Sequence, residues 1–233
     1  MYEEKIIPPK KAMPQAQDGT LRKFALRVPE VIYQCSGIIV FGKRIKSLVF
    51  STDLSIIKNV NADAIIAVYP FTPQPIITQA LLLAADIPVF AGVGGGLTKG
   101  QRVVSLAMFA EMQGATGVVL NAPTANAVVQ HVAETIDIPV VVTVARADTD
   151  FEARLQAGAN IFNVSAAAET PAIVRSIRER YPDVPIIATG GPTDESILET
   201  IQAGANAITW TPPSNGEIFR DIMAAYRDNK PHP

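Results

Sequence analysis

The chain has 233 residues, of which 48% are hydrophobic and 18% are charged, and its formal net charge is −2. It carries no excess of Lys and Arg to neutralise a phosphate backbone, which argues against nucleic acid as a partner. A single cysteine, Cys35, excludes disulfide scaffolds and thiolate metal sites, and no apolar run approaches the ~20 residues that span a bilayer, so we expect a cytoplasmic protein with no membrane partner.

The first 46 residues are expected to form an extension outside the main fold. Residues 1–20 are polar and rich in Lys and Pro, which predicts a flexible arm. Within residues 21–46 the apolar spacing first predicts an amphipathic helix, ending near Cys35 and interrupted or kinked by Pro29. Two apolar runs then flank Gly42-Lys43, the pattern of a hairpin whose second arm leads into the first strand of the main fold.

Residues 47–228 repeat one supersecondary unit, and residues 229–233 form a tail. Eight continuous apolar runs, typical of parallel strands buried on both faces, are separated by helical stretches. The strand cores are expected at 47–51, 64–69, 88–92, 117–121, 139–144, 161–164, 185–189 and 207–210. We therefore predict an α/β fold, a single (β/α)8 TIM barrel with an N-terminal helix and hairpin extension. The alternative, an open doubly wound sheet, would carry its glycine fingerprint after the first strand, whereas the glycine cluster here follows the third.

Two alternating signals precede the strands, and both are interpreted as structural. In one signal a glycine follows a helical run, where a left-handed residue ends the helix; it occurs at Gly114, Gly158 and Gly204, with Asn61 in the equivalent place of the first copy. In the other signal a proline opens the strand, where its missing N–H costs little; it occurs at Pro88, Pro139 and Pro185.

Candidate catalytic residues follow from the rule that barrel ligands are bound at the C-terminal ends of the strands. Asp53 and Asp148 offer carboxylates for general acid/base work or for a divalent metal, although both are also suited to capping the helices that follow. Asn121, Thr143 and Asn163 end the fourth, fifth and sixth strands and are candidate polarising partners.

The turn after the seventh strand suggests an anion site. Gly190 and Gly191 let backbone N–H groups approach a ligand, and Thr193 is placed to cap the next helix, whose N-terminus attracts anions. After the eighth strand two prolines offer no N–H donor, so the remaining donors would come from Ser214, Asn215 and Gly216. A tight strand-to-helix turn without a ligand is the alternative.

The same segment carries a family resemblance. Ile-Ile-Ala-Thr-Gly-Gly-Pro-Thr, followed one helix later by Ala-Gly-Ala-Asn-Ala-Ile, resembles the last quarter of ribulose-phosphate-binding barrels over roughly 25 residues. That group includes thiamin phosphate synthases, keto-deoxy-phosphogluconate aldolases, N-acylmannosamine-6-phosphate epimerases and glycerol-operon antiterminator proteins. The resemblance implies a barrel that binds a small phosphorylated metabolite through Gly190 and Gly191. No strand ends in a lysine, so the Schiff-base lysine of the aldolases has no counterpart.

A glycine cluster after the third strand is a candidate substrate loop. Gly94, Gly95 and Gly96 precede Lys99 and Arg102, so the loop could close over an anionic substrate. A surface loop with solvated charges is the alternative. Arg146, beyond the fifth strand, could clamp an anion or form a surface ion pair.

Three functions remain open from the sequence. The first is an enzyme, a lyase or isomerase that uses carboxylate acid/base chemistry on a small phosphorylated metabolite. The second is a non-catalytic barrel that senses a phosphorylated ligand, and the third is a metal-assisted hydrolase using Asp53 and Asp148. No cofactor is predicted, a divalent metal is left open, and so is a homo-oligomer.

Overall fold

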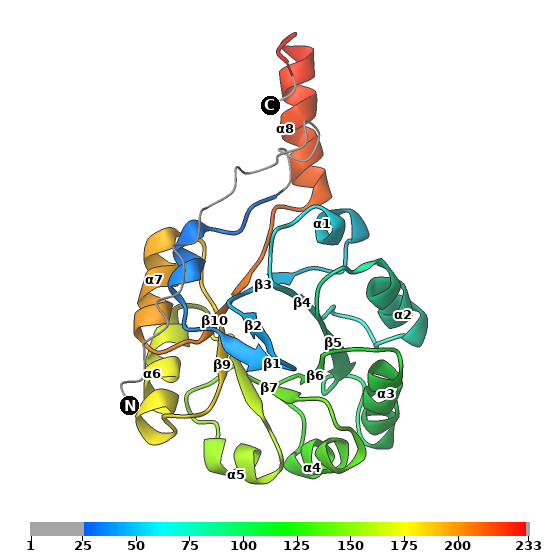
Figure 1. The fold of residues 1–233 in the computed structure, drawn as a ribbon, viewed down its shortest axis with the longest axis vertical. Coiled ribbons are helices and arrows are strands. Elements are labelled where there is room, and N and C mark those ends of the chain that lie inside the picture. Colours follow the sequence, from blue (N-terminus) through cyan, green and yellow to red (C-terminus); the bar gives the residue numbers. More distant parts are fainter. Residues whose placement is uncertain (1–25, 232–233) are drawn as a thin grey trace, which may run out of the picture.

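The protein, described by a computed structural model over residues 26–231, folds as a closed barrel of eight parallel strands (Figure 1). Each strand pairs with the next in the chain, and the last pairs with the first. The strands are β3 (Ser47–Phe50), β4 (Ala64–Ala67), β5 (Val89–Gly94), β6 (Gly117–Leu120), β7 (Val140–Val144), β8 (Ile161–Val164), β9 (Ile186–Thr189) and β10 (Ala207–Trp210). The TIM barrel predicted from the repeat is confirmed.

Helices follow the strands around the ring. They are α1 (Leu54–Lys58), α2 (Pro75–Ala84), α3 (Gln101–Met112), α4 (Asn126–Thr135), α5 (Phe151–Gln156), the short 3-10 helix η3 (Ala167–Glu169), α6 (Thr170–Arg180), α7 (Asp194–Gln202) and α8 (Asn215–Arg227). No helix of residues 26–231 has both the length and the apolar character needed to cross a membrane.

Two apolar clusters hold the barrel together, one inside the ring of strands and one between strands and helices. The inner cluster includes Leu48, Phe90, Val141 and Ile187, which come from alternate strands, as expected for one layer of barrel packing. The outer cluster joins the other strand faces to the helices. Because each strand is covered on both sides, the continuous apolar runs in the sequence are explained.

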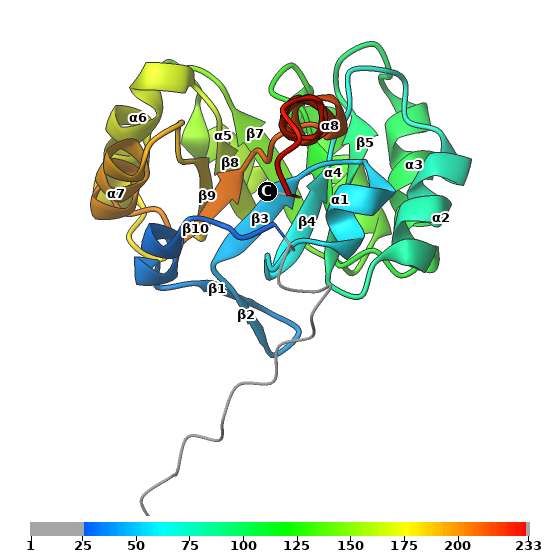
Figure 2. The same cartoon turned by 90° about the horizontal axis from the view of Figure 1, so that it is seen from above.

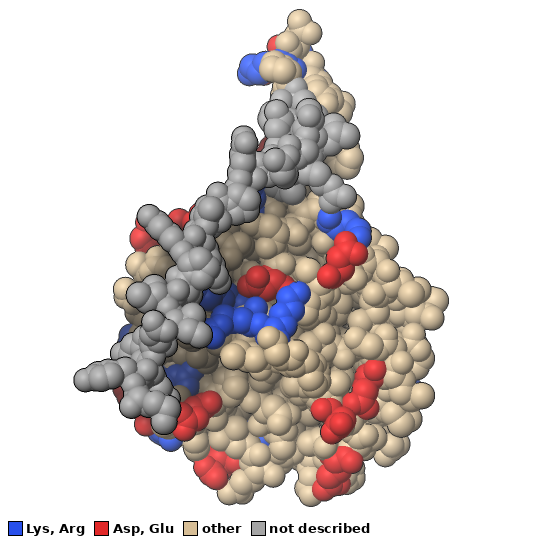
Figure 3. All heavy atoms as spheres, in the orientation of Figure 1, with Lys and Arg blue, Asp and Glu red and all other residues tan. Residues whose placement is uncertain are grey.

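The predicted hairpin closes one end of the barrel (Figures 1 and 2). Strands β1 (Ile38–Val40) and β2 (Lys43–Ile45) pair antiparallel, and their inward side chains join the inner cluster. The turn lies at Phe41-Gly42, one residue earlier than predicted, with φ of 47° and 77°, as a two-residue hairpin turn requires. Lys and Arg side chains gather near the centre of this end of the molecule (Figure 3).

The segment before the hairpin differs in extent from the expected helix. Its helical part is the 3-10 helix η2 (Glu30–Gln34), which begins directly after Pro29, while the part of the expected helix before residue 26 lies outside the described residues. Val28, Ile32 and Cys35 are at most 1% exposed and belong to the outer cluster. This segment lies between α7 and α1 (Figure 1), where the eighth helix of a regular barrel would pack.

Helix α8 stands away from the ring of strands (Figures 1 and 2). None of its described residues is buried. It is joined to the barrel at its first residue, because the Asn215 amide donates to the Asp53 carboxylate and exchanges hydrogen bonds with the Ser55 hydroxyl. Of its apolar side chains, Ile218 is half-buried and packs against the outer cluster, so α8 contributes only at its first turn to the packing of the barrel.

At the closed end of the barrel, the glycine and the asparagine of the repeated Gly-Ala-Asn signal each have a structural role. Gly114, Gly158 and Gly204 have φ of 94°, 99° and 114°, as predicted. The side-chain oxygens of Asn160 and Asn206 accept from the first N–H of the preceding strand, at Val140 and Ile186. Asp63 does the same for Ser47 in the first copy. The prediction for Asn61 was wrong: it lies outside the left-handed region, and its side chain instead accepts from the Val28 N–H.

Cys35 should be inert in the folded protein. It is 1% exposed, and burial raises the pKa of its thiol to about 12, against the opposing charge of Lys46. Because the thiolate is the reactive form, we expect a thiol reagent at pH 8 to label Cys35 only after unfolding in urea. Rapid labelling of the native protein would show that the segment before the hairpin opens freely.

Candidate functional site

The open end of the barrel holds a cavity of about 270 Å³, here called the mouth. At ~30 Å³ per water molecule, this is room for roughly nine waters or a small metabolite. Strands β3, β4 and β7 to β10, and the residue that follows β6, contribute to its wall. The lining residues are Phe50, Ile66, Val68, Asn121, Thr143, Asn163, Ser165, Thr189, Thr209 and Thr211. Three of the predicted catalytic residues, Asn121, Thr143 and Asn163, are thus brought together.

Two polar atoms in the mouth are buried without a partner. They are Oδ1 of Asn163 and Oγ1 of Thr209, on side chains that are 8% and 7% exposed. The other end of the Asn163 amide, Nδ2, donates to the Thr143 hydroxyl at 3.3 Å. Unpaired buried polar groups cost stability, and their position at the C-terminal end of a barrel makes them candidates for contact with a ligand.

A second cavity of about 200 Å³, the side pocket, adjoins the mouth and shares Val68 and Asn121 with it. Its other walls are the loop after β4 (Tyr69, Pro70, Phe71, Thr72 and Pro73), the end of β5 (Gly92 and Gly94) and the glycine loop that follows (Gly96, Leu97 and Thr98). Thr98 is 4% exposed and its hydroxyl also lacks a partner. All three buried unpartnered side-chain atoms of residues 26–231 therefore belong to the mouth or the side pocket.

Asp53, the first predicted acid/base residue, does not line either cavity. Its carboxylate caps α1, accepting from the N–H groups of Ser55 and Ile56, and it binds Asn215 of α8. The Ser55 hydroxyl, followed by these backbone groups, lowers the pKa of Asp53, with partial burial opposing. Asp53 acts here as a helix cap, and its catalytic role stays a prediction that this placement does not favour.

The charged residues predicted around the mouth lie outside its wall. Asp148 is paired with Arg146 through two hydrogen bonds of 2.8 and 2.6 Å, and this partner lowers the pKa of Asp148. Both side chains are more than half exposed. Lys99 and Arg102 are exposed and absent from the described walls of both cavities. The site as described is uncharged.

The glycine loop is packed rather than open. Gly94 and Gly95 are buried with φ of 135° and 106°, and the Gly94 carbonyl accepts from the Asn121 N–H. A Cβ on Gly95 would stand 1.9 Å from Oγ1 of Thr124. The loop therefore forms a fixed wall, and closure over a substrate stays a prediction.

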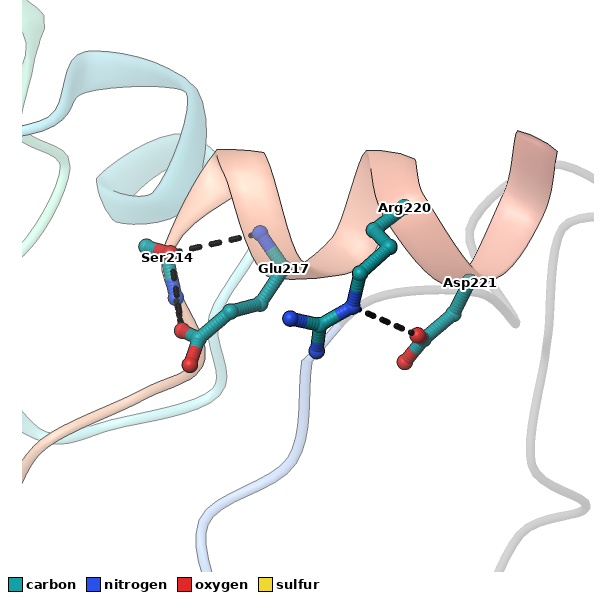
Figure 4. A network of polar contacts seen from close by, with 4 residues as sticks. All are labelled: Ser214, Glu217, Arg220 and Asp221. Atoms are coloured by element: carbon teal, nitrogen blue, oxygen red, sulfur yellow. Dashed lines mark hydrogen bonds and ion pairs between the residues drawn. The ribbon is translucent and has the colours of Figure 1, made fainter. Parts of the chain in front are cut away.

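The predicted phosphate corner is occupied by helix caps. Gly190 is buried, and a Cβ there would meet Ile197 and Ile208, so this glycine permits close packing. Gly191, with φ of 80°, is exposed, and Thr193 caps α7 as predicted. Ser214 and Glu217 form a capping box at α8 (Figure 4), and Gly216 follows in its first turn.

The charge around this corner is negative. Carboxylates stand in the first turns of both helices, at Asp194, Glu195 and Glu217, and Asp53 adjoins Asn215. Hydrogen bonds from the Ser214 N–H and hydroxyl lower the pKa of Glu217, which keeps it ionised. These carboxylates take the place that a bound anion would take at the helix ends, so the corner does not favour phosphate.

Five lining residues were not selected as site residues from the sequence: Thr98 and Thr209, and also Ser165, Thr189 and Thr211, which lie at the strand ends where ligand contacts were expected. Thr209 lies one residue before the strand end that was inspected, and the two-residue alternation of a strand would have placed it on the inner face with Ala207 and Thr211. Thr98 carried no signal, because its burial depends on how the glycine loop folds back.

The fold and its open end define a (β/α)8 barrel with a ligand cavity at the C-terminal ends of the strands. Comparison with protein-family models gives no match, and comparison with curated protein sequences gives none either. Among solved structures, a putative phosphonomutase from Burkholderia cenocepacia is similar at TM-score 0.62 and 15% identity, over 78% of this chain and 93% of that one.

A second similar structure is a 2,3-dimethylmalate lyase, described as a PEP mutase/isocitrate lyase superfamily member; its TM-score is 0.61 at 12% identity, over 91% of this chain and 88% of that one. A third is a phosphonopyruvate hydrolase with oxalate and Mg++, at TM-score 0.58 and 13% identity, over 80% of this chain and 84% of that one. At these identities the likeness shows the barrel fold. The barrel fold that the resemblance implied is thus borne out, whereas the ribulose-phosphate-binding relatives themselves are not shown.

The magnesium of that hydrolase allows a test of this mouth as a metal site. Magnesium in proteins is held through carboxylates that keep several of its waters. The mouth offers neutral hydroxyl and amide groups, and within residues 26–231 no three His, Cys, Asp or Glu side chains come together as a metal-binding group. The residues present do not fit a protein-held magnesium ion.

Proposed function

We propose that the protein is a TIM-barrel enzyme of the lyase or mutase kind that acts on a small metabolite bound in the mouth. The observation that carries the proposal is the pair of unpartnered buried groups, Asn163 Oδ1 and Thr209 Oγ1, at the end of the barrel where such enzymes bind their substrates. The named activities of the similar structures, a phosphonomutase, a phosphonopyruvate hydrolase and a lyase, agree with this class.

The chemistry of the mouth suits a substrate carbonyl. Hydroxyl and amide donors fixed in a cavity stabilise negative charge that develops on oxygen as a neighbouring bond breaks. Thr143, Asn163 and Thr209 are placed for this role. The two ends of an amide can exchange by rotation, so Asn163 can present either a donor or an acceptor to the substrate.

A proton would be moved by Tyr69, which replaces the carboxylates predicted from the sequence. Among the described residues lining the mouth and the side pocket, Tyr69 alone has a titratable side chain. Its hydroxyl oxygen accepts from the Gln74 N–H at 2.8 Å, which orients the group and leaves its proton free to be donated.

The test begins with a thermal-shift screen over small oxo acids, hydroxy acids and phosphorylated metabolites. A ligand at a hundred times its dissociation constant adds about 2.7 kcal/mol of stability. We expect Thr209→Val to abolish this shift while raising the free energy of unfolding of the free protein by about 1 kcal/mol, because an unpaired buried hydroxyl is removed. Asp53→Asn is the matched control and should keep the ligand shift.

Turnover separates an enzyme from a binding protein. We expect Tyr69→Phe to bind the same ligand and to lose at least about 100-fold in turnover, the usual contribution of a general acid or base. Unchanged ligand binding in Thr209→Val would refute the mouth as the site. Tight binding without turnover by the native protein would instead support the non-catalytic sensor, which the absence of charged side chains from the described mouth favours as the second candidate.

A further inference from the structure

We propose that the side pocket binds an uncharged apolar group of the substrate, an alkyl or aryl chain, whose polar end lies in the mouth. The inference rests on the proposed function for the polar end and adds the class of substrate. The two cavities share Val68 and Asn121, so one molecule can occupy both. The Asn121 side chain turns toward the glycine loop, its Nδ2 lying 3.9 Å from the place of a Cβ on Gly96.

The side pocket excludes a charged group. No Lys, Arg, His, Asp or Glu is among the described residues that line it, and the two nearby cations of the glycine loop and α3, Lys99 and Arg102, face solvent. A phosphate or carboxylate enclosed here would lose its hydration without gaining a counter-charge, which is costly. A neutral group does not incur this cost of desolvation.

One part of the pocket wall, on the loops after β4 and β5, is suited to an apolar group, and polar side chains make up the rest. Val68, Tyr69, Pro70, Phe71, Pro73 and Leu97 supply apolar surface. Phe71 and Leu97, on the loops after β4 and β5, are 73% and 86% exposed, so folding of this chain does not bury them. An apolar ligand lying between the two loops would cover both side chains, and the burial of this surface favours binding.

Of the four polar side chains that line the pocket, Tyr69, Thr72, Thr98 and Asn121, only Thr98 is buried with an unpartnered hydroxyl. Thr98 is 96% buried, and its hydroxyl has no partner among the described residues. The bound chain therefore carries one hydrogen-bonding atom near its attachment, such as an ether, ester or amide oxygen. The mouth has seven polar side chains against four in the side pocket, so it offers the polar end of the substrate more hydrogen-bonding partners.

The experiment compares two neutral amides that differ by one aryl group, propionamide and 3-phenylpropionamide, by titration with ligand-observed NMR. We expect the aryl amide to bind at least about tenfold more tightly. Inorganic phosphate, added as a competitor, should displace neither amide. Equal affinity for the two amides, or displacement of the aryl amide by phosphate, would overturn the proposal.

Variants assign the effect to each cavity. Gly96→Phe should remove the advantage of the aryl amide and leave propionamide unchanged, because the nearest atom to a new Cβ is 3.9 Å away and the φ of Gly96 lies outside the strained range. Gly96→Ala is the matched control and should keep the advantage. Leu97→Asp is a second variant of the side pocket. It should also remove the advantage of the aryl amide, because it places a charge at the rim of the pocket.

Different outcomes would refute the proposal for the side pocket and the proposed function of the mouth. Retention of the aryl advantage in both Gly96→Phe and Leu97→Asp would refute the side pocket alone. Asn163→Leu should weaken both amides in parallel, since it removes the polar contacts of the mouth. Unchanged affinity for both amides in Asn163→Leu would refute the mouth, and with it the proposed function.

Discussion

Gly95→Ala is expected to lower the free energy of unfolding by about 2 to 6 kcal/mol, a large part of the ~5–15 kcal/mol that holds a domain together. At φ of 106° a side chain is strained, which costs roughly 1–3 kcal/mol. The new Cβ would also stand 1.9 Å from the Thr124 hydroxyl and 3.0 Å from the backbone of Asn121, which adds roughly 1–3 kcal/mol of overpacking.

Urea unfolding followed by circular dichroism measures this effect, and the neighbouring glycine supplies the control. Gly96→Ala meets nothing closer than 3.9 Å and should change stability by less than about 0.5 kcal/mol. Equal stability of the two variants would show that the glycine loop adjusts freely. In that case the fixed wall described for the side pocket would be wrong, and a mobile lid would be supported.

Arg178→Met is expected to destabilise the closed end of the barrel by about 2 to 4 kcal/mol. The Arg178 guanidinium donates to the carbonyls of Gly204, Pro182 and Val184 and to the Asn206 side chain, so it ties together the loops before β9 and β10. Burial lowers the pKa of Arg178, and the group remains charged at neutral pH. Methionine keeps the apolar stem and leaves these acceptors without their donor.

The control for Arg178 lies three residues earlier on the same helix. Arg175 is exposed, so Arg175→Met should alter the thermal midpoint far less. Ligand binding in Arg178→Met should be retained below its lowered midpoint, because Arg178 is at the opposite end of the strands from the mouth. A thermal midpoint equal to that of Arg175→Met would show that water replaces the guanidinium without cost.

Most of the fold could be predicted because its signals are local. A glycine ends a helix and a proline opens a strand through the conformation of one residue, so Gly158 and Pro139 mark element ends without knowledge of the packing. The prediction of a left-handed conformation for Asn61 was wrong because it depended on alignment of the repeats. Its place in the repeat was matched by alignment with the glycines, whereas the residue that acts as in the other copies is Asp63, through its side chain.

The site was predicted less well because its chemistry depends on which groups remain unpaired. Asp53 and Thr209 both lie at strand ends, and their sequence neighbourhoods do not show that the carboxylate of Asp53 is used by caps while the hydroxyl of Thr209 has no partner. The amphipathic pattern of α8 is equally uninformative, since it is the same whether the helix covers its own barrel or stands apart.

The position of the segment before the hairpin has a consequence for how the chain reaches its native state. It spans the join between the first and last barrel strands, where Gly37 donates to the Asn206 carbonyl and Asn206 to a serine 170 residues earlier, Ser36. Contacts so distant in sequence form late. A nascent chain still lacking β10 (Ala207–Trp210 of 233 residues) therefore exposes two parallel-strand edges, and these edges are covered only near the very end of synthesis.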